Sequence, residues 1–316
     1  MEKITNVAVF SNGRALLLYL LLKDSDEINS TYFFIESIHP NLEHCTYLKP
    51  QWGNVFRFVW FMTKLRIRVI YKYRFLQEAH IYAQDSISIA GPIVGSRPFD
   101  LIEEGVSNYI CKSRRLRFNF IKKILCGELF TKEVFGHSDQ VRKIYLTGMF
   151  PIPKAIKEKV EVVNMQELWN ASSPDKRNYI CKVFGMGEFG IDDRKIDSVL
   201  ITQPLSEDLA LTEEEKISLY KQIIGDKNIM IKPHPREKTN YAKYFPSASI
   251  IDASVPLELF ALTSRTKFKD VYTIFSTAAF VFPYDVKIHF AGTKVNSKLK
   301  ERYGNIDFID GKIVRN

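Results

Sequence analysis

The sequence predicts an α/β protein in which helices cover parallel sheets and the chain is divided into two domains. Three observations carry this expectation. Short runs of β-branched and aromatic residues recur along the chain, and stretches with helical apolar spacing separate them. The third is the length of 316 residues, which two cores of roughly 150 residues bury more efficiently than one. With 46% hydrophobic and 26% charged residues, the composition excludes collagen, coiled coils and disulfide scaffolds.

The first half of the chain opens with a strand, a tight turn and a helix. Asn6 to Phe10 is β-branched and aromatic, Ser11-Asn12-Gly13 supplies turn residues, and an apolar stretch with helical spacing follows. Further runs predict strands with helices or loops crossing between them, at residues 32–35, 80–82, 86–89, 101–102 and 144–147.

The second half repeats this rhythm. A strand is expected at 198–202, a helix at 212–224 that ends at Gly225, and a second strand at 229–232. Thr212 and Glu215 have the spacing of a capping box. Strands at 250–252, 272–275 and 287–290 and a helix at 256–262 complete the series. Two prolines near residues 148–157 predict the domain break, which gives domains 1–155 and 156–316.

The net charge and the cysteine content indicate which partners and which cellular compartment to expect. Lys plus Arg exceed Asp plus Glu by 45 − 36 = 9, which favours an anionic partner such as nucleic acid, a phosphorylated metabolite or a membrane leaflet. The cysteines at 45, 111, 126 and 181 form no C-x-x-C pair, so we expect free thiols in a reducing compartment. The apolar runs 16–22 and 55–62 are too short to span a bilayer, and we expect a cytoplasmic protein.

The sharpest local feature is Lys232-Pro233-His234-Pro235-Arg236, directly after a predicted strand. Ligands of open α/β sheets bind where strands end, and the prolines restrict the backbone on both sides of the imidazole. Flanking cations suit an anionic ligand, and a histidine here could donate a proton to a phosphate oxygen. A rigid loop with an exposed histidine is the alternative interpretation.

Carboxylates follow two other predicted strands. Glu103 and Glu104 stand before Gly105, and Asp208 ends the segment Gln203-Pro204-Leu205-Ser206-Glu207-Asp208. One of Glu103 and Glu104 could act as a general base, although adjacent acids in a turn are usually only solvated. The segment that ends at Asp208 offers a second pair of carboxylates that could converge on the same site, and a helix-entry loop is its alternative interpretation.

Small and hydroxyl side chains after the strand at 272–275 predict a phosphate-binding segment. Ser276 and Thr277 offer two hydroxyls where a helix can begin, although hydroxyls at such positions are often only caps. Glu258 lies in the first turn of the helix at 256–262, where its carboxylate could accept hydrogen bonds from sugar hydroxyls.

Two basic segments interleaved with aromatics occur at 64–74 and 112–123. Both are typical of amphipathic surfaces attracted to anionic lipid headgroups, and a solvated helix face is the alternative. Because no nucleic-acid-binding motif accompanies them, we expect an anionic membrane surface and no nucleic acid as partner.

In order along the chain, IEEG at 102–105, KPHP at 232–235, PLELF at 256–260 and FSTAAF at 275–280 resemble the bacterial sialyltransferases of glycosyltransferase family 52. The resemblance implies a GT-B arrangement of two Rossmann-like domains that face a cleft, with an acceptor-side domain at 1–155 and a CMP-sugar-binding domain at 156–316. It implies CMP-sialic acid as donor, inverting transfer to a sugar hydroxyl of lipooligosaccharide or capsule, and no cofactor or metal.

By position, His234 resembles the histidine that contacts or protonates the departing CMP phosphate, and Pro235 keeps it in place. Ser276 and Thr277 match the hydroxyl pair that holds this phosphate, and Glu258 the carboxylate on the cytidine ribose. Lys232, Ser11 and Asn12 complete the expected donor-binding set.

The base stays open between Asp208 and the acidic pair of Glu103 and Glu104. A lipid-linked glycan acceptor such as a terminal galactose, a homodimer, and a peripheral position on the inner face of the bacterial cytoplasmic membrane are further expectations. The alternatives are a GT-B enzyme that uses a UDP- or GDP-sugar and a non-enzymatic membrane-associated scaffold of polysaccharide assembly.

Overall fold

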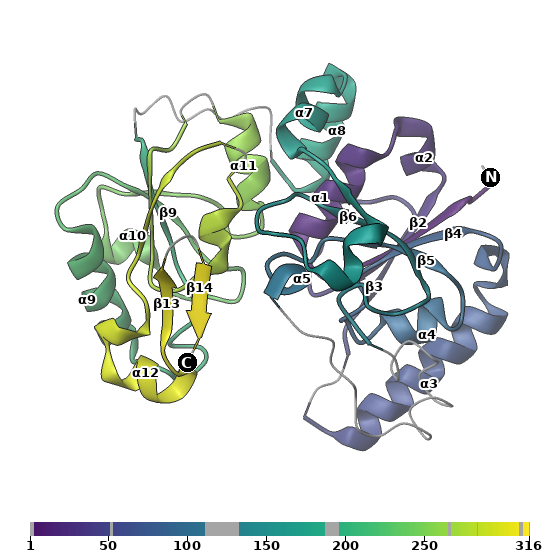
Figure 1. Ribbon diagram of the computed structural model, residues 1–316, viewed down its shortest axis with the longest axis horizontal. Coiled ribbons are helices and arrows are strands. Elements are labelled where there is room, and N and C mark those ends of the chain that lie inside the picture. Colours follow the sequence, from purple (N-terminus) through teal and green to yellow (C-terminus); the bar gives the residue numbers. More distant parts are fainter. Residues whose placement is uncertain are drawn as a thin grey trace. The chain divides into compact units, whose positions relative to one another are not determined.

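The structure is a computed structural model that describes residues 3–50, 53–110, 133–186, 196–264, 267–282, 284–309 and 312–315. The chain forms two compact units, Met1–Gly185 and Met186–Asn316 (Figure 1). The division comes later than the predicted break after residue 155. The reason is that strand β7 (Val160–Val162) pairs with β6 (Val141–Leu146) in the first sheet, so the segment with the two prolines lies inside the first unit.

Unit 1 holds one seven-stranded sheet in the order β3-β2-β1-β4-β5-β6-β7, and every pairing in it is parallel. Its other strands are β1 (Asn6–Phe10), β2 (Thr31–Glu36), β3 (Cys45–Leu48), β4 (His80–Ala83) and β5 (Phe99–Ile102). Its helices are α1 (Gly13–Leu22), α2 (Ser25–Asn29), α3 (Val55–Tyr71), η1 (Arg74–Leu76), α4 (Ala90–Val94), α5 (Ser107–Ile110), η3 (Lys154–Lys159), α7 (Met165–Ala171) and α8 (Pro174–Val183).

Helices cover both faces of this sheet because successive strand residues point to opposite sides. Val7 and Val9 pack in one core with Leu65 of α3 and Ile93 of α4. On the other face, the ring of Tyr19 from α1 lies 5.6 Å from Phe10 and 5.1 Å from Tyr82, centroid to centroid, while α7 packs beside α1 (Figure 1).

Unit 2 holds a five-stranded parallel sheet in the order β10-β9-β8-β11-β12 and a separate antiparallel hairpin of β13 and β14. The strands are β8 (Ser198–Ile201), β9 (Met230–Lys232), β10 (Ser249–Ile250), β11 (Asp270–Thr273), β12 (Lys287–Phe290), β13 (Ile306–Ile309) and β14 (Lys312–Arg315). The helices are α9 (Glu213–Ile224), α10 (Tyr241–Tyr244), α11 (Leu257–Thr263), η4 (Thr277–Phe280), η5 (Thr293–Val295) and α12 (Ser297–Tyr303).

Two cores sandwich this second sheet. Leu200, Ile231 and Tyr272 pack with α9 on one side, while Val199, Met230 and Val271 pack with α11 on the other. In both units the strand order reverses beside the first strand, between β1 and β4 and between β8 and β11. Crevices at such switch points are where open α/β sheets bind ligands.

Most predicted elements are confirmed, including the helix α9 with its Thr212–Glu215 capping box and with Gly225 at φ +59°. One predicted strand is wrong. Residues 86–89 form bends and a turn that leads into α4, because Glu104 binds the backbone amide of Ser86 and the isoleucines pack into the core from the loop. The short strands β3 and β7 and the β13–β14 hairpin are not anticipated by the sequence patterns.

The expectations about free thiols, the basic segments and membrane spans can be compared only with the described part of the chain. Cys45 and Cys181 are free, whereas Cys111, Cys126 and the basic segment 112–123 lie outside the described residues. Across the described ranges, none of the helices combines the length and the apolar character needed to cross a bilayer.

Candidate active site

The predicted site residues gather at the carboxyl ends of the two sheets, one group in each unit. In unit 2 they follow β8, β9 and β11, except that Lys232 is the last residue of β9 and buried Glu258 lies in the first turn of α11. In unit 1 they follow β1 and β5.

His234 lies in the loop after β9, where its carbonyl accepts a 2.9 Å hydrogen bond from the amide of Glu237 and so closes a turn with Pro235 in its second position. Proline favours that position because its ring fixes φ. The Nδ1 atom of His234 accepts a 3.1 Å hydrogen bond from the amide of Arg236, so the neutral ring carries its proton on Nε2. Burial, then the positive charge of Arg236, lower the pKa of His234. At neutral pH the loop therefore presents a neutral imidazole with a fixed Nε2–H donor.

Glu237 fixes this loop from below. One carboxylate oxygen accepts a hydrogen bond from the amide of His234 at 2.7 Å and another from the hydroxyl of Thr202. The other oxygen accepts from Tyr241 at 2.6 Å and pairs with the ammonium of Lys216 at 3.2 Å. The side chains of Glu237 and Lys216 are 1% and 0% exposed, so a buried ion pair sets the position of the histidine backbone.

Asp208 binds the guanidinium of Arg236 with both carboxylate oxygens, at 2.8 and 3.1 Å. This pairing holds the pKa of Asp208 below its usual range. The structure thus brings Asp208 and His234 to one place, because Arg236 contacts both. It also makes Asp208 a weak proton acceptor as long as the pair persists.

Lys232 is 6% exposed and its ammonium donates to three backbone carbonyls, those of Pro233, Asp252 and Ala253, at 3.0 to 3.2 Å. Burial lowers the pKa of Lys232 to about 8, against the charge of buried Glu258, which raises it. All three N–H donors of the Lys232 ammonium bind backbone carbonyls of the protein. Lys232 therefore contributes a positive charge beneath the loop and not a free hydrogen-bond donor.

Ser276 and Thr277 follow β11 at the entrance of the short helix η4. The hydroxyl of Ser276 accepts from the amide of Ala278 at 3.3 Å, and the amide of Ser276 donates to Thr273 at 3.0 Å. Both residues are half-buried. Gln203 after β8 accepts from the amide of Phe275 at 3.0 Å and so connects the two strands at the switch point.

Glu103 and Glu104 in unit 1 differ sharply. Glu103 is 0% exposed and its oxygens bind Arg14 at 2.9 Å, Tyr109 at 2.7 Å and the hydroxyl of Thr147 at 2.9 Å. Every side of that carboxylate faces protein, so its geometry is that of a buried structural ion pair and not of a base that meets substrate.

Glu104 points instead to the loop after β4, where its carboxylate accepts from the amide of Ser86 at 3.1 Å and from the Ser86 hydroxyl. Burial, then the charge of Asp85, raise the pKa of Glu104 to about 7. Asp85 is 4% exposed and accepts from the amides of Phe135 and Gly136 at 2.8 Å each, and burial raises its pKa to about 6. A carboxylate whose pKa lies near 7 is well suited to general base catalysis.

Ser11 and Asn12 complete this group at the end of β1. The side chain of Asn12 caps α1 by accepting from Ala15 at 2.9 Å and donates to the carbonyl of Glu104 at 3.4 Å. The amide of Ser11 donates to Gln84 at 2.6 Å. Gln84 is 0% exposed, and its side-chain nitrogen makes no hydrogen bond within the described structure, as is true of the side-chain nitrogen of buried Asn108. The side-chain oxygen of Asn108 accepts from the amide of Glu104 at 2.8 Å, so Asn108 holds the backbone at this carboxylate.

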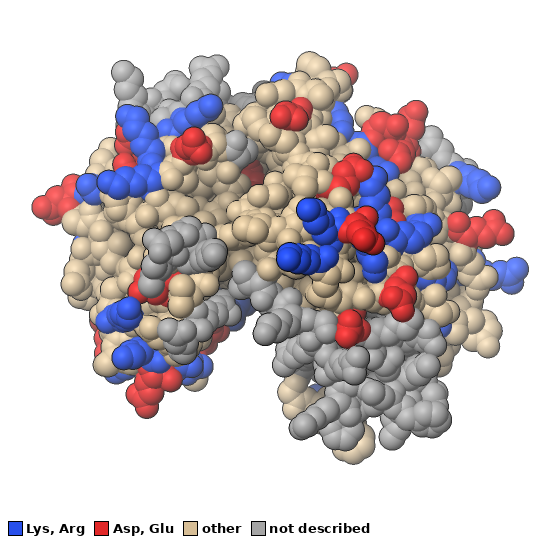
Figure 2. Space-filling view, in the orientation of Figure 1, with Lys and Arg blue, Asp and Glu red and all other residues tan. Residues whose placement is uncertain are grey.

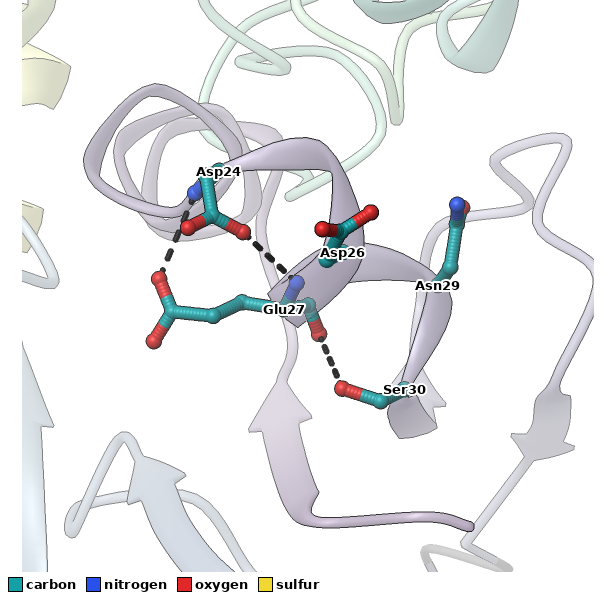
Figure 3. A pocket seen from close by; sticks show the side chains of 5 residues that line it. All are labelled: Asp24, Asp26, Glu27, Asn29 and Ser30. Atoms are coloured by element: carbon teal, nitrogen blue, oxygen red, sulfur yellow. Dashed lines mark hydrogen bonds between the residues drawn. The ribbon is translucent and has the colours of Figure 1, made fainter. Parts of the chain in front are cut away.

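A pocket of about 350 Å³ lies elsewhere, over α2, and is lined by Asp24, Asp26, Glu27, Asn29 and Ser30 (Figure 3). These residues precede β2, so the pocket lies at the amino end of that strand, away from the carboxyl edge. Its carboxylates serve the capping box of α2, in which Glu27 and Asp24 bind each other's amides (Figure 3). We therefore assign it no part in the chemistry.

Two units, each built on a parallel α/β sheet with titratable groups at its carboxyl ends, are the architecture expected of a GT-B-type glycosyltransferase. The chain belongs to glycosyltransferase family 52, whose family model matches residues 17–299. It is also 37% identical over 318 residues to an uncharacterized protein of Haemophilus influenzae (strain ATCC 51907 / DSM 11121 / KW20 / Rd), a match that covers 96% of this chain and 99% of that one.

Two solved structures share the fold. The α/β-galactoside α-2,3-sialyltransferase of the luminous marine bacterium Photobacterium phosphoreum has a TM-score of 0.56 at 12% identity and covers 91% of this chain and 90% of its own. The GT-B domain of a Photobacterium damselae sialyltransferase has a TM-score of 0.55 at 11% identity, with 90% of both chains covered. The predicted family and fold class are confirmed, and the chain is a glycosyltransferase.

Sequence reasoning missed two residues that build the site. Asp85 directly follows Gln84 at the end of β4, so the rule that favoured carboxylates after strands would have found it. Glu237 stands three residues after His234, but its partners Lys216 and Tyr241 come to it only through the fold, and no local pattern indicates them.

Proposed function

We propose that this protein is an inverting sialyltransferase that moves sialic acid from CMP-sialic acid to a terminal galactose hydroxyl of a bacterial surface glycan, either lipooligosaccharide or capsule. The observation that carries the proposal is the fixed Nε2–H donor of His234 in a glycosyltransferase of family 52. The two Photobacterium proteins with the same fold are both sialyltransferases, which supports this donor class.

On this proposal unit 2 binds the donor. The Nε2–H of His234 and the hydroxyls of Ser276 and Thr277 donate to the CMP phosphate, and Glu258 accepts from the cytidine ribose. As the bond between the anomeric carbon and the phosphate oxygen breaks, the electron pair leaves with CMP. Preorganised donors stabilise that developing charge, an effect typically worth several kcal/mol. The approaching phosphate also raises the pKa of His234, so the imidazole gains the capacity to deliver a proton.

Unit 1 supplies the acceptor side. An acceptor hydroxyl oxygen forms the new bond to the anomeric carbon from the face opposite CMP, which inverts the configuration, and its proton passes to a carboxylate. Glu104 is favoured over Asp208 because its pKa is raised to about 7, whereas Asp208 is held ionised by Arg236.

The proposed enzyme works without a metal or other cofactor, because hydroxyls, the imidazole and the buried charge of Lys232 take over the stabilisation of the phosphate. A homodimer, a lipid-linked acceptor and a peripheral position at the inner face of the cytoplasmic membrane remain part of the proposal.

The test is calorimetric binding of CMP, UDP and GDP to the wild-type protein and to His234→Ala, with EDTA present throughout. CMP-selective binding that the variant weakens supports the proposal and leads to an acceptor screen with CMP-sialic acid. Preference for UDP or GDP rejects the donor and keeps the transferase. No nucleotide binding at all favours a scaffold role in polysaccharide assembly.

A further inference from the structure

Helix α3 has two apolar faces, and only one of them belongs to the core. Met62, Leu65 and Val69 are buried at helical spacing, and α3 packs along α4 on this side (Figure 1). A helix on the surface of a globular protein normally carries polar residues on the opposite face.

The opposite face of α3 is instead aromatic and aliphatic. Phe56, Trp60, Ile67 and Tyr71 recur at intervals of four and seven residues, which places them on one stripe. Phe56 is 88% exposed, Trp60 is 60% and Tyr71 is 74%. Scattered apolar residues on a surface need no explanation, but a stripe along a helix of 17 residues marks an interaction surface.

Cations flank this stripe. Arg57, Lys64 and Arg68 are exposed, and the Lys64 ammonium lies 5.0 Å from the centre of the Trp60 ring system. The helix contains no Asp or Glu, and Lys72 and Arg74 continue the charge beyond its end. On the face of the molecule drawn in Figure 2, by contrast, basic side chains are interspersed with acidic ones.

We infer that α3 is a membrane-docking helix that lies in the plane of an anionic bilayer, with Phe56, Trp60 and Tyr71 among the acyl chains and the flanking cations on lipid phosphates. Amphipathic aromatics and basic side chains on one helix are the chemistry that recognises such an interface. Lipid is favoured over a second copy of this face, because a two-fold pairing would bring cationic stripes together with no acid on α3 to offset them.

This lipid binding stands apart from the transferase chemistry, so it is tested without any substrate. The full-length protein is sedimented with vesicles of phosphatidylcholine alone and of phosphatidylcholine mixed with phosphatidylglycerol. We expect binding only to the mixed vesicles, weakened by added salt. Failure of the wild-type protein to bind the mixed vesicles overturns the inference, whatever nucleotide it binds.

Two double variants separate insertion from charge. Phe56→Ser with Trp60→Ser removes apolar contact, and Lys64→Glu with Arg68→Glu reverses two charges; each should lower the vesicle partition coefficient at least about tenfold. The matched controls are Val162→Ser, a 56% exposed valine of β7, and Lys300→Glu on α12. Equal loss in the controls overturns the assignment to α3.

An unchanged circular dichroism spectrum and thermal unfolding transition show that the variants fold, and light scattering reports their oligomeric state. A shift from dimer to monomer without loss of vesicle binding assigns the stripe to a second copy and also overturns the inference.

Discussion

The carboxylate of Glu237 accepts a 2.7 Å hydrogen bond from the backbone amide of His234, so an ion pair beneath the loop sets the position of the histidine. The imidazole itself is then oriented by the amide of Arg236. Separate contacts therefore position the backbone and the ring of His234. Substitutions at His234 and at Glu237 are for this reason expected to have different effects.

Removing the ring of His234 should damage the chemical step more than donor binding. His234→Ala is expected to lower kcat about a hundredfold, since a positioned proton donor typically contributes 10²- to 10⁴-fold, while donor KM rises much less. Steady-state kinetics with CMP-sialic acid measures both. The matched control is His289→Ala in β12, whose ring pairs with Asp270 and lies outside the proposed site. An unchanged kcat in His234→Ala would refute the assigned role.

Breaking the ion pair beneath the loop should destabilise unit 2. Glu237→Leu leaves the fully buried ammonium of Lys216 with Glu207, 3.6 Å away, as its remaining acidic partner, and the loss of one partner from a buried pair costs about 3–5 kcal/mol. Urea unfolding measures the free energy. The double variant Lys216→Met with Glu237→Leu should recover a large part of the loss, because no buried charge remains unpaired. If the double variant is as unstable as the sum of both single variants, the pair does not couple.

The acidic limb of the pH profile identifies the base. A general base must be ionised, so kcat falls as pH drops below the pKa of that carboxyl. With the pKa of Glu104 at about 7, we expect kcat to fall roughly tenfold per pH unit below pH 7, whereas Asp208, whose pKa is lowered by Arg236, would place the acidic limb below the usual range of an aspartate.

Asp85→Asn provides the check on this pH profile. It removes the negative charge that contributes to the raised pKa of Glu104, so the limb should move to lower pH without disappearing. A limb that stays near pH 7 in this variant and in Glu104→Gln excludes Glu104 as the base and returns the role to Asp208.

Substitutions of the adjacent residues Glu103 and Glu104 should have different effects, the first on stability and the second on catalysis. Glu103→Gln removes the charge that pairs with buried Arg14, so its free energy of unfolding should fall by about 3 kcal/mol while kcat of the folded enzyme stays within a few-fold. Glu104→Gln should keep most of the stability and lose about a hundredfold in kcat. Thermal unfolding and kinetics on the same two preparations test this. The opposite pattern would place the base at Glu103.

The fold was largely predictable, because buried parallel strands leave continuous apolar runs such as Asn6–Phe10 and Ser198–Ile201 in the sequence. The short edge strands were not predictable. Val160–Val162 is half-buried or exposed, so it carries no apolar run, and its pairing with β6 is what places the unit boundary later than the prolines indicated. The residues 86–89 alternate as a strand does, but the fold holds them with Glu104.

Site positions were predictable where a residue follows a strand, as for His234, Asp208 and Ser276. What the sequence left open was which of these side chains stay accessible. Lys232 and Glu103 have the same local pattern as functional residues, yet their partners come from segments far along the chain, at Asp252 and Arg14. These tertiary contacts decide whether a site side chain is accessible to a ligand, and the local sequence pattern does not predict them.

The burial of Lys216 has a consequence for its chemical reactivity. Its ammonium is enclosed by Glu237, Thr239 and Glu207, and its side chain is 0% exposed, whereas Lys269 at 76% and Lys298 at 57% lie open to solvent. An amine-reactive reagent should therefore label the surface lysines quickly and reach Lys216 only when the loop that carries His234 opens. The rate at which Lys216 is modified, measured by mass spectrometry, would therefore report how often the loop that carries His234 opens. No probe has to be introduced into the protein for this measurement.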